Sequence, residues 1–479
     1  MDSLYKIIKQ LSEEEFQDIY QNLTSNKAEK SALFLETIRS STNPVEDFLE
    51  KQDISASAFY VLKSRLNQKV EDYLLNRLGD PKMEAIHKVF KIYELIFTNP
   101  REISVKTLQK LEKTMLEMDN PSVLMTVYRG LKMLHSYDDD ERARYEKEYN
   151  QAVAFYLTTE KAIETVMNFF RVYDRYYLGR REKDLNELIR LIEKVNNINN
   201  LYASQRLYIC KAIVHLFAVH FLELPDRLLE ILDKEEDAFQ KSFEILEKNP
   251  DDILFKNLNL IFDYLRYCYY SKTNDVVKEQ IYFDLLDYKI EDLLTGYNFG
   301  MDCSQILFYK FRKHHAEGTK GKLNTDLADH ISKIQVDSYR LVTYVNYNLL
   351  FAYAAFYEKK YENAARILYR IRNEVNFRKS PHADLEIKLF LGLCYVLLGE
   401  SDLANQLILS LQRQLKKSTF SKYEQGRTLS KILTNRLGGK TAKKAAQLRL
   451  LIDEFNGLNR GPIRILDHME INYSLFTDS

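Results

Sequence analysis

The apolar residues of this chain are spaced as in α-helices almost throughout. In residues 55–78, for example, apolar side chains recur every three or four positions and share one helix face, whereas Arg65 and Lys69 fall on the opposite face. We find no run in which apolar and polar residues alternate one by one, as they do in a half-buried strand. The pattern predicts an all-α protein with about twenty or more helices.

Short polar breaks divide the helical pattern into segments of roughly 15–25 residues, a length that suits helices better than strands. The break at 79–81 ends in Pro81, and proline disfavours helical geometry in the residue before it. We predict four regions: a small helical N-terminal domain at 1–80, divergent helical hairpins at 81–340, repeated hairpins with a basic final pair at 341–456, and a C-terminal tail at 457–479.

Residues 388–408 place two glycines in an otherwise apolar stretch of a chain that has only fourteen. Gly392 lies within the apolar run, and Tyr395 follows three positions later. Gly399 comes four residues after Tyr395, and Ala404 five after that. This order is typical of two helices that cross closely, joined by a glycine turn.

A similar order recurs forty residues upstream, and the two copies resemble the tetratricopeptide repeat. The upstream copy has small residues in both helices, an aromatic residue beside the turn and a large residue after it: Ala352, Ala364, Tyr361 and Leu368. Lys359 occupies the place of Gly399, and the interval of forty residues exceeds the roughly 34 usual in the family. A third hairpin at 428–455 keeps a Gly-Gly turn with altered spacing. The resemblance implies an α-solenoid of stacked antiparallel hairpins.

In tetratricopeptide proteins the first helix of each hairpin lines an inner surface that binds partners. The positions that correspond in this chain are Asn346, Leu349, Tyr353, Phe356, Tyr357, Glu386, Leu389 and Leu393. They are mostly apolar or aromatic, which favours an apolar peptide or an amphipathic helix over a bound terminal carboxylate. The alternative is that further helices cover these positions and leave no groove.

The net charge is zero, with 69 basic and 69 acidic residues, but the charges are unevenly distributed. Residues 411–464 contain thirteen basic and three acidic residues. A candidate basic patch for nucleic acid comprises Arg427, Lys431, Lys440, Lys443 and Lys444. Three of these lysines lie at the start of a predicted helix, where the helix dipole disfavours cations. The alternative interpretation is a solvated end of the solenoid.

Motifs of catalysis and of metal or nucleotide binding are missing from the sequence. A phosphate-binding loop would need glycine at position 434, where this chain has Thr434, and no GxGxxG, GxSxG or HExxH motif occurs. The four cysteines include no CxxC pair and are expected to be buried thiols. No apolar run approaches the roughly 18 residues of a membrane span. We expect no enzyme activity, no cofactor, no metal and no membrane insertion, and a cytoplasmic location.

The sequence therefore predicts a non-enzymatic scaffold or adaptor that binds a protein or peptide along the inner face of a helical-repeat solenoid. The alternative hypothesis is a nucleic-acid-associated regulator, with a tetratricopeptide-like sensor region and a basic C-terminal patch.

Overall fold

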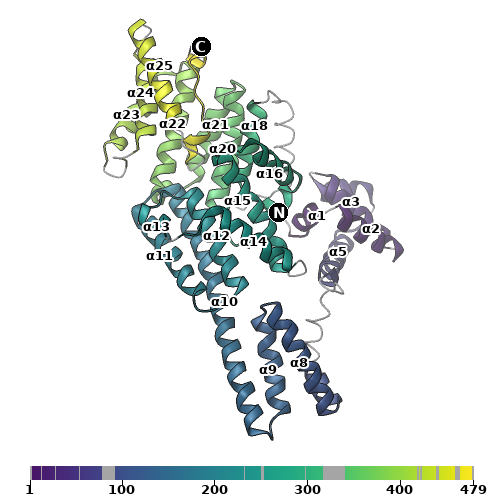
Figure 1. Ribbon diagram of the computed structural model, residues 1–479. Helices are drawn as coiled ribbons and strands as arrows, with labels where there is room; N and C mark the ends of the chain where they lie inside the picture. The colour runs from purple at the N-terminus through teal and green to yellow at the C-terminus, as the bar shows by residue number, and fades with distance from the viewer. Residues whose placement is uncertain are drawn as a thin grey trace.

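The computed structural model describes residues 3–77, 92–316 and 340–476, apart from short breaks at 12, 27, 42, 53, 231, 250–252, 274, 297, 418–419, 421–422, 439–441 and 459–463. All regular secondary structure within these residues is helical (Figure 1), which confirms the all-α prediction. The expected boundary at 80/81 lies outside the described residues.

Five helices form an N-terminal unit with a core of its own: α1 (Ser3–Gln10), α2 (Glu13–Ser25), α3 (Glu29–Ser40), α4 (Pro44–Lys51) and α5 (Ala56–Arg77). Helix α3 lies at its centre and packs against the other four. Its Phe34 ring contacts the rings of Phe48 and Phe59, with centroid distances of 4.8 and 5.1 Å. The periodic apolar face of α5 therefore packs inward, as its pattern predicts.

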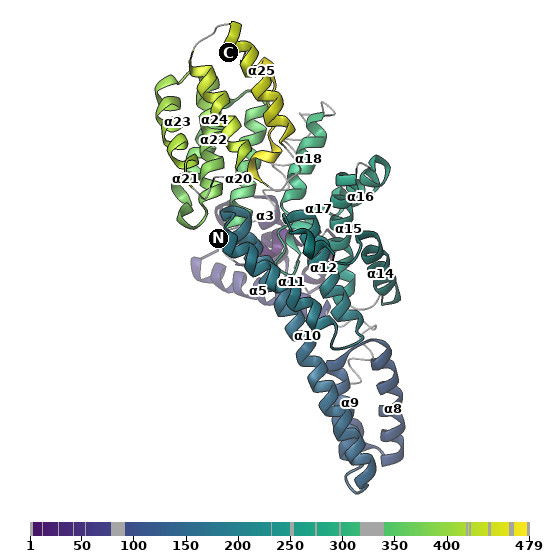
Figure 2. The ribbon, with the colours of Figure 1, turned by 60° about the vertical axis from the view of Figure 1, so that its left-hand side comes forward.

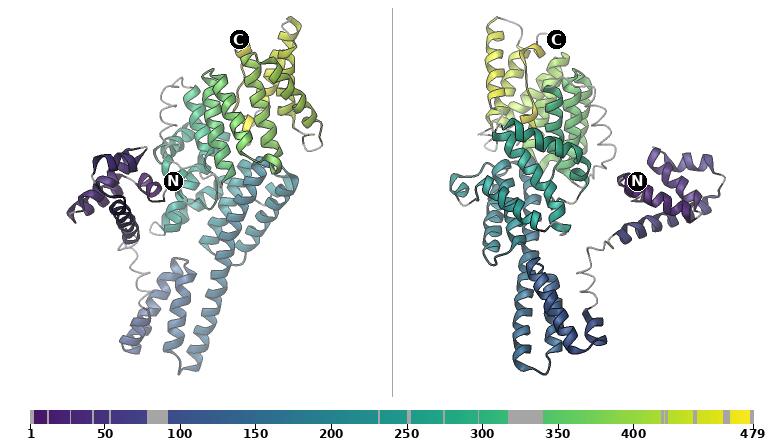
Figure 3. Two further views of the ribbon diagram at one scale, coloured as in Figure 1. Left: turned by 180° about the vertical axis from the view of Figure 1, so that it is seen from behind. Right: turned by 45° about the vertical axis from the view of Figure 1, so that its right-hand side comes forward.

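A second core is built by α7 (Ile92–Thr98), α8 (Arg101–Glu117), α9 (Pro121–Leu134) and the first half of α10 (Asp139–Gly179). Proline at the start of α9 and the Asp138 side chain, which accepts the Glu141 N–H, fix two of these helix starts. Helix α10 has 41 residues and is about 60 Å long at 1.5 Å per residue. Figure 3 shows this group projecting from the rest of the chain.

The turn between α8 and α9 is tied to the start of α12 (Gln205–Phe221) through Asp119. Its carboxylate Oδ2 accepts hydrogen bonds from Ser204 Oγ at 2.7 Å and from the Arg206 N–H at 3.1 Å. The Arg206 guanidinium also donates to the Asp119 carbonyl at 2.9 Å. The second core is thus anchored at its inner end.

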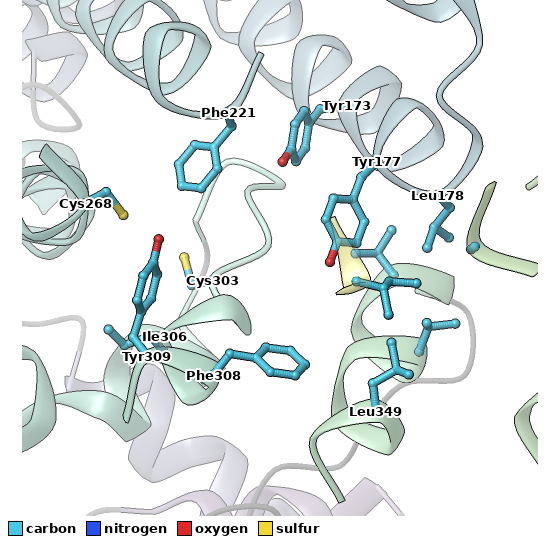
Figure 4. Close-up of a cluster of buried hydrophobic side chains, with 14 of the residues drawn as sticks. Tyr173, Tyr177, Leu178, Phe221, Cys268, Cys303, Ile306, Phe308, Tyr309 and Leu349 are labelled. Atoms are coloured by element: carbon cyan, nitrogen blue, oxygen red, sulfur yellow. The ribbon is translucent and has the colours of Figure 1, made fainter. Parts of the chain in front are cut away.

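The largest core runs from the second half of α10 to residue 476. Its central helices are α11 (Glu182–Asn199), α12 (Gln205–Phe221), α13 (Asp226–Leu229), α14 (Glu235–Lys248), α15 (Ile253–Thr273), α16 (Val276–Tyr288), α17 (Ile290–Thr295) and α18 (Gln305–Ala316). Figure 4 shows Tyr177 of α10, Phe221, Cys268 of α15, Phe308 of α18 and Leu349 facing one interior. All four cysteines are buried free thiols, as expected.

Three antiparallel hairpins complete this core: α20 (Leu341–Tyr357) with α21 (Tyr361–Glu374), α22 (Pro381–Leu398) with α23 (Ser401–Leu415), and α24 (Glu424–Leu437) with α25 (Ala442–Gly457). Each hairpin packs on the next, through α21 against α22 and through α24 against both α22 and α23 (Figure 2). Two short 3-10 turns follow, η4 (Ile465–His468) and η5 (Tyr473–Phe476). Residues 465–476, which we expected in a tail, contribute buried side chains to this core.

The two hairpin turns have the same left-handed backbone. Gly399 follows α22 with φ +77°, and Lys359 follows α20 with φ +61°. Glycine adopts this conformation without the steric penalty that a Cβ brings, so Lys359 accepts a strained position in the place where Gly399 is free of strain.

Enlarging Gly392 is expected to destabilise the stacked hairpins. A Cβ at this position would lie 3.2 Å from Leu433 Cδ1 of α24 and 3.7 Å from Leu407 Cδ2 of α23. We expect Gly392→Leu to lower the free energy of unfolding by about 1–3 kcal/mol, because overpacking forces neighbouring helices apart. Denaturant unfolding measures the change. Ser401→Ala, in the nearby exposed turn, is the control, and equal stability of the two variants would show that Gly392 is not at a close crossing.

Candidate functional site

The eight predicted groove residues lie on α20 and α22 and face the interior. Seven of them are buried, among them Tyr353 at 0 % and Glu386 at 3 % exposure, and Tyr357 is half-buried. What covers them includes the end of the chain, residues 464–476, here called the C-terminal segment (yellow in Figure 1): its turn η4 lies against α22 and its turn η5 against α25. Of the two alternatives that the sequence leaves open, the structure shows the covered one, since other parts of the chain lie over these positions.

Tyr353 and Glu386 hold the backbone of the C-terminal segment at its first buried residue. The Tyr353 hydroxyl donates to the carbonyl of Ile465 at 2.6 Å. The N–H of Ile465 donates to Glu386 Oε2 at 2.9 Å. Both main-chain groups of Ile465, its N–H and its carbonyl, are thus bound by side chains from two successive hairpins.

The same kind of contact continues along the segment. The Tyr357 hydroxyl donates to the carbonyl of His468 at 3.3 Å and accepts the N–H of Glu470 at 2.9 Å. Asn456 of α25 binds Ile471 twice, donating through Nδ2 to its carbonyl at 2.8 Å and accepting its N–H through Oδ1 at 3.2 Å. Four side chains from three helices therefore bind the main chain of residues 465–471.

The side chains of the segment fill the space between the hairpins and the central helices. Four of them are aliphatic and buried: Ile465, Leu466, Met469 and Ile471. The His468 ring stacks on Phe308 of α18, with centroids 4.2 Å apart and planes at 15°. Burial, together with the positive charge of Arg312, lowers the pKa of His468 to about 3, so this imidazole is neutral.

A buried polar cluster surrounds the start of the segment. Glu386 accepts a second hydrogen bond, from the Tyr423 hydroxyl to Oε1 at 2.6 Å. Burial raises the pKa of Glu386, whereas the Tyr423 hydrogen bond and the charges of Arg464 and Arg180 oppose the rise. Asp467 Oδ2 accepts the Arg464 N–H at 2.7 Å. Burial, then repulsion from Glu386, raises the pKa of Asp467 to about 7.

The remaining groove positions have structural contacts within the core. Asn346 donates to Ser304 Oγ at 2.9 Å and accepts from the Tyr177 hydroxyl at 3.4 Å, which joins α10, α20 and the residues before α18. The other four side chains pack among buried apolar neighbours: Leu349, Phe356, Leu389 and Leu393. Of the eight predicted residues, Tyr353, Tyr357 and Glu386 are thus the ones for which hydrogen bonds to the segment are found.

One flank of the segment borders a cleft of about 670 Å³. Its walls are the end of α15, the start of α16, α18 and residues 467–470, with Phe283, Phe311 and Tyr357 among the lining side chains. Glu470 is exposed there, whereas its neighbours Met469 and Ile471 are buried. Of the segment residues at this cleft, Glu470 is therefore the one exposed to solvent.

The basic patch does not form one tight cluster in the described residues. Arg427 and Lys431 lie one turn apart on α24, whereas Lys443 and Lys444 follow the α24–α25 turn, about 15 Å further along the axis from Arg427 at 1.5 Å per residue. Lys440 lies outside the described residues. The Arg427 guanidinium donates to the Phe420 carbonyl at 3.2 Å.

Lys444 has a local partner that explains its position. Its ammonium group donates to the carbonyl of Gly438, the residue that caps the C-terminus of α24. A cation is favourable at that end of a helix, so this contact offsets the unfavourable placement at the start of α25. Lys431 and Lys443 are exposed.

Sequence reasoning missed the partners that the inner face has in this chain. The pattern Ile465, Leu466, Met469 and Ile471 indicates a buried stretch, but it has no helical period that would place it on a neighbour. Asn456 and Tyr423 also carried no signal, because asparagines and tyrosines are frequent throughout the chain.

Comparisons of the chain with family models, with curated proteins and with solved structures find no match. Within the described residues, no helix combines the length and apolar character that crossing a membrane requires. The same residues contain no group of three or more His, Cys, Asp or Glu side chains suited to a metal ion.

Proposed function

We propose that this chain is a non-enzymatic interaction scaffold, and that the inner face of its tetratricopeptide-like hairpins binds an extended segment of a protein partner. The observation that carries the proposal is the set of main-chain hydrogen bonds from Tyr353, Tyr357, Glu386 and Asn456 to residues 465–471. Main-chain contacts do not depend on the sequence that is bound, and extended-peptide recognition commonly combines them with pockets for alternate side chains.

The hairpin geometry supports the family resemblance. The small residues of both copies are buried: Ala352, Ala364, Gly392 and Ala404. A Cβ at Gly392 would contact Leu407 of its own hairpin and Leu433 of the next one. Both turns are left-handed, at Lys359 and Gly399. We infer that α20–α25 form three tetratricopeptide-like units, the number usually needed for a stable stack.

A pull-down tests this function and its alternative together. We expect the full chain carrying Leu466→Asp, whose C-terminal segment no longer fits its buried site, to capture a protein from lysate at about 0.3 M salt, well above physiological ionic strength, because apolar burial is barely weakened by screening. An excess of a synthetic peptide of residues 464–476 should release the captured protein, and a peptide with Leu466→Asp should not. A Lys431/Lys443/Lys444→Glu variant of this chain should still capture it.

The nucleic-acid hypothesis gives the opposite pattern. Binding through phosphates falls steeply with salt, with log K losing roughly 0.7–0.9 for each unit of log salt concentration per phosphate neutralised. Recovery of nucleic acid alone, only at low salt, and its loss in the lysine variant would contradict the scaffold and support the basic patch. No observation on Arg427, Lys431, Lys443 or Lys444 favours that outcome at present.

A further inference from the structure

We propose that the C-terminal segment is a built-in competitor for the inner face, and that the partner it excludes presents an extended stretch of the same chemistry. That stretch has two adjacent aliphatic residues, then a carboxyl-bearing residue, then aliphatic residues two and four positions further on. The inference rests on the proposed function, because it describes the partner and the regulation of the same groove.

The aliphatic positions follow from the burial of the resident segment. Leu466, Met469 and Ile471 have exposed fractions of 0 %, and Ile465 of 3 %. Glu470 and Asn472, between and beyond them, are exposed. A partner therefore needs apolar side chains at these four positions and a side chain that packs on Phe308 at the position of His468, which is also buried, whereas the exposed positions accept any residue.

The carboxyl position follows from the turn that Asp467 makes inside a buried polar cluster. Arg464 precedes it in the segment, Arg180 approaches from the end of α10, and Glu386 approaches from α22. The hydroxyls of Tyr177, Tyr353 and Tyr423 complete its surroundings. Within the segment, Asp467 Oδ2 accepts the Arg464 N–H at 2.7 Å and so fixes the turn with which the segment begins; a partner that follows the same path needs an acceptor side chain at this position.

The segment differs from the repeat helices in a way that permits exchange. Its regular structure is limited to two 3-10 turns of four residues each, so leaving the groove breaks no helix. The three hairpins of α20–α25 also contact one another directly, through helix–helix contacts that do not involve the segment. The cleft beside residues 467–470 also gives solvent, and an incoming chain, access to one flank. Opening this segment therefore breaks the contacts of residues 465–471 alone and leaves every helix folded, which is the kind of local opening that hydrogen exchange detects.

Attachment in the same chain makes the segment a strong competitor. A tethered segment acts at an effective concentration of the order of millimolar, so a free peptide of the same sequence binds the closed chain only weakly. Weakening the resident segment should therefore open the groove to a peptide added in solution.

The test uses the full chain and a fluorescein-labelled synthetic peptide of residues 464–476, with binding followed by fluorescence anisotropy. Full-length Leu466→Asp should bind the peptide at least about 100-fold more tightly than the wild-type chain does. A peptide with Asp467→Ala should bind that variant at least about 10-fold more weakly, and a peptide with Glu470→Ala, at the exposed position, should bind unchanged.

Several outcomes overturn the inference. It fails if the folded Leu466→Asp chain binds no peptide, or if both chains bind it equally, whatever the pull-down recovers. Concentration-dependent dimers of the wild-type chain that Leu466→Asp abolishes would assign the groove to a second copy instead.

Should Leu466→Asp not fold, hydrogen exchange of the wild-type chain decides. The amides of Ile465, Met469 and Ile471 should exchange at least about ten times faster than those of α20 and α22. Equal protection of the segment and of the two helices would show that the segment does not leave the groove by itself.

Discussion

Replacing Glu386 by alanine is expected to lower the free energy of unfolding by about 3–5 kcal/mol, the cost of breaking a buried charge network from one side. The Tyr423 hydroxyl and the Ile465 N–H would both lose their acceptor. Arg180, whose charge acts on Glu386 within the same buried cluster, would lose a compensating carboxylate. Denaturant unfolding followed by circular dichroism measures the change.

Two variants separate this effect from a general loss of a glutamate. Glu362→Ala removes an exposed residue whose ion pair with Arg366 is an i, i+4 contact on the surface of α21, and should change stability by less than about 0.5 kcal/mol. Glu386→Gln retains an acceptor oxygen and should lie between the two. If Glu386→Ala is as stable as Glu362→Ala, the carboxylate does not hold the C-terminal segment.

The stability of the wild-type chain is expected to fall, relative to Asp467→Asn, as the pH rises from 5 to 8. Burial and Glu386 raise the pKa of Asp467 from 3.8 to about 7 in the folded chain. Between these values the unfolded chain has lost the proton and the folded chain keeps it, so raising the pH favours unfolding. Two pH units of this difference amount to about 3 kcal/mol, and asparagine has no proton to lose.

The measurement is the difference in unfolding free energy between the two proteins at pH 5 and at pH 8. Asp467→Asn keeps an oxygen that accepts the Arg464 N–H, so the local turn should be preserved. Parallel stability profiles for the two proteins would show that Asp467 is ionised in both states and would contradict the assigned pKa.

The helices and hairpin turns could be predicted from the sequence because their causes are local. The apolar period of α5 and the glycine at 399 act over a few residues, and the structure places both as expected. The identity of the groove's occupant could not be predicted in this way. The pattern around Tyr353 and Glu386 shows that a face is apolar, but not which part of the chain covers it, and Ile465 lies 112 residues beyond Tyr353.

The basic patch is a second feature whose arrangement in space could not be predicted from the sequence. A count of charges along the chain brings Arg427, Lys443 and Lys444 together, whereas the hairpin separates Arg427 from the other two along its axis. The hydrogen bond from Lys444 to Gly438 depends on how α24 ends, which the charge pattern does not contain.

The length of α10 has a mechanical consequence. Asp139 lies about 35 Å along the helix axis from Ala162, where the helix enters the largest core. If this half of α10 tilts as one unit, about 5° at that entry moves the far end by about 3 Å, the arc that a length of about 35 Å sweeps. The hydrogen bonds of Asp119 to Ser204 and Arg206 lie at the base of the projecting group and resist such a tilt. Helix α10 therefore acts as a lever that pivots where it enters the core at Ala162 and is restrained by Asp119. Its second half packs against α20 and α22, so a tilt of the projecting group is transmitted to the helices that carry the groove residues.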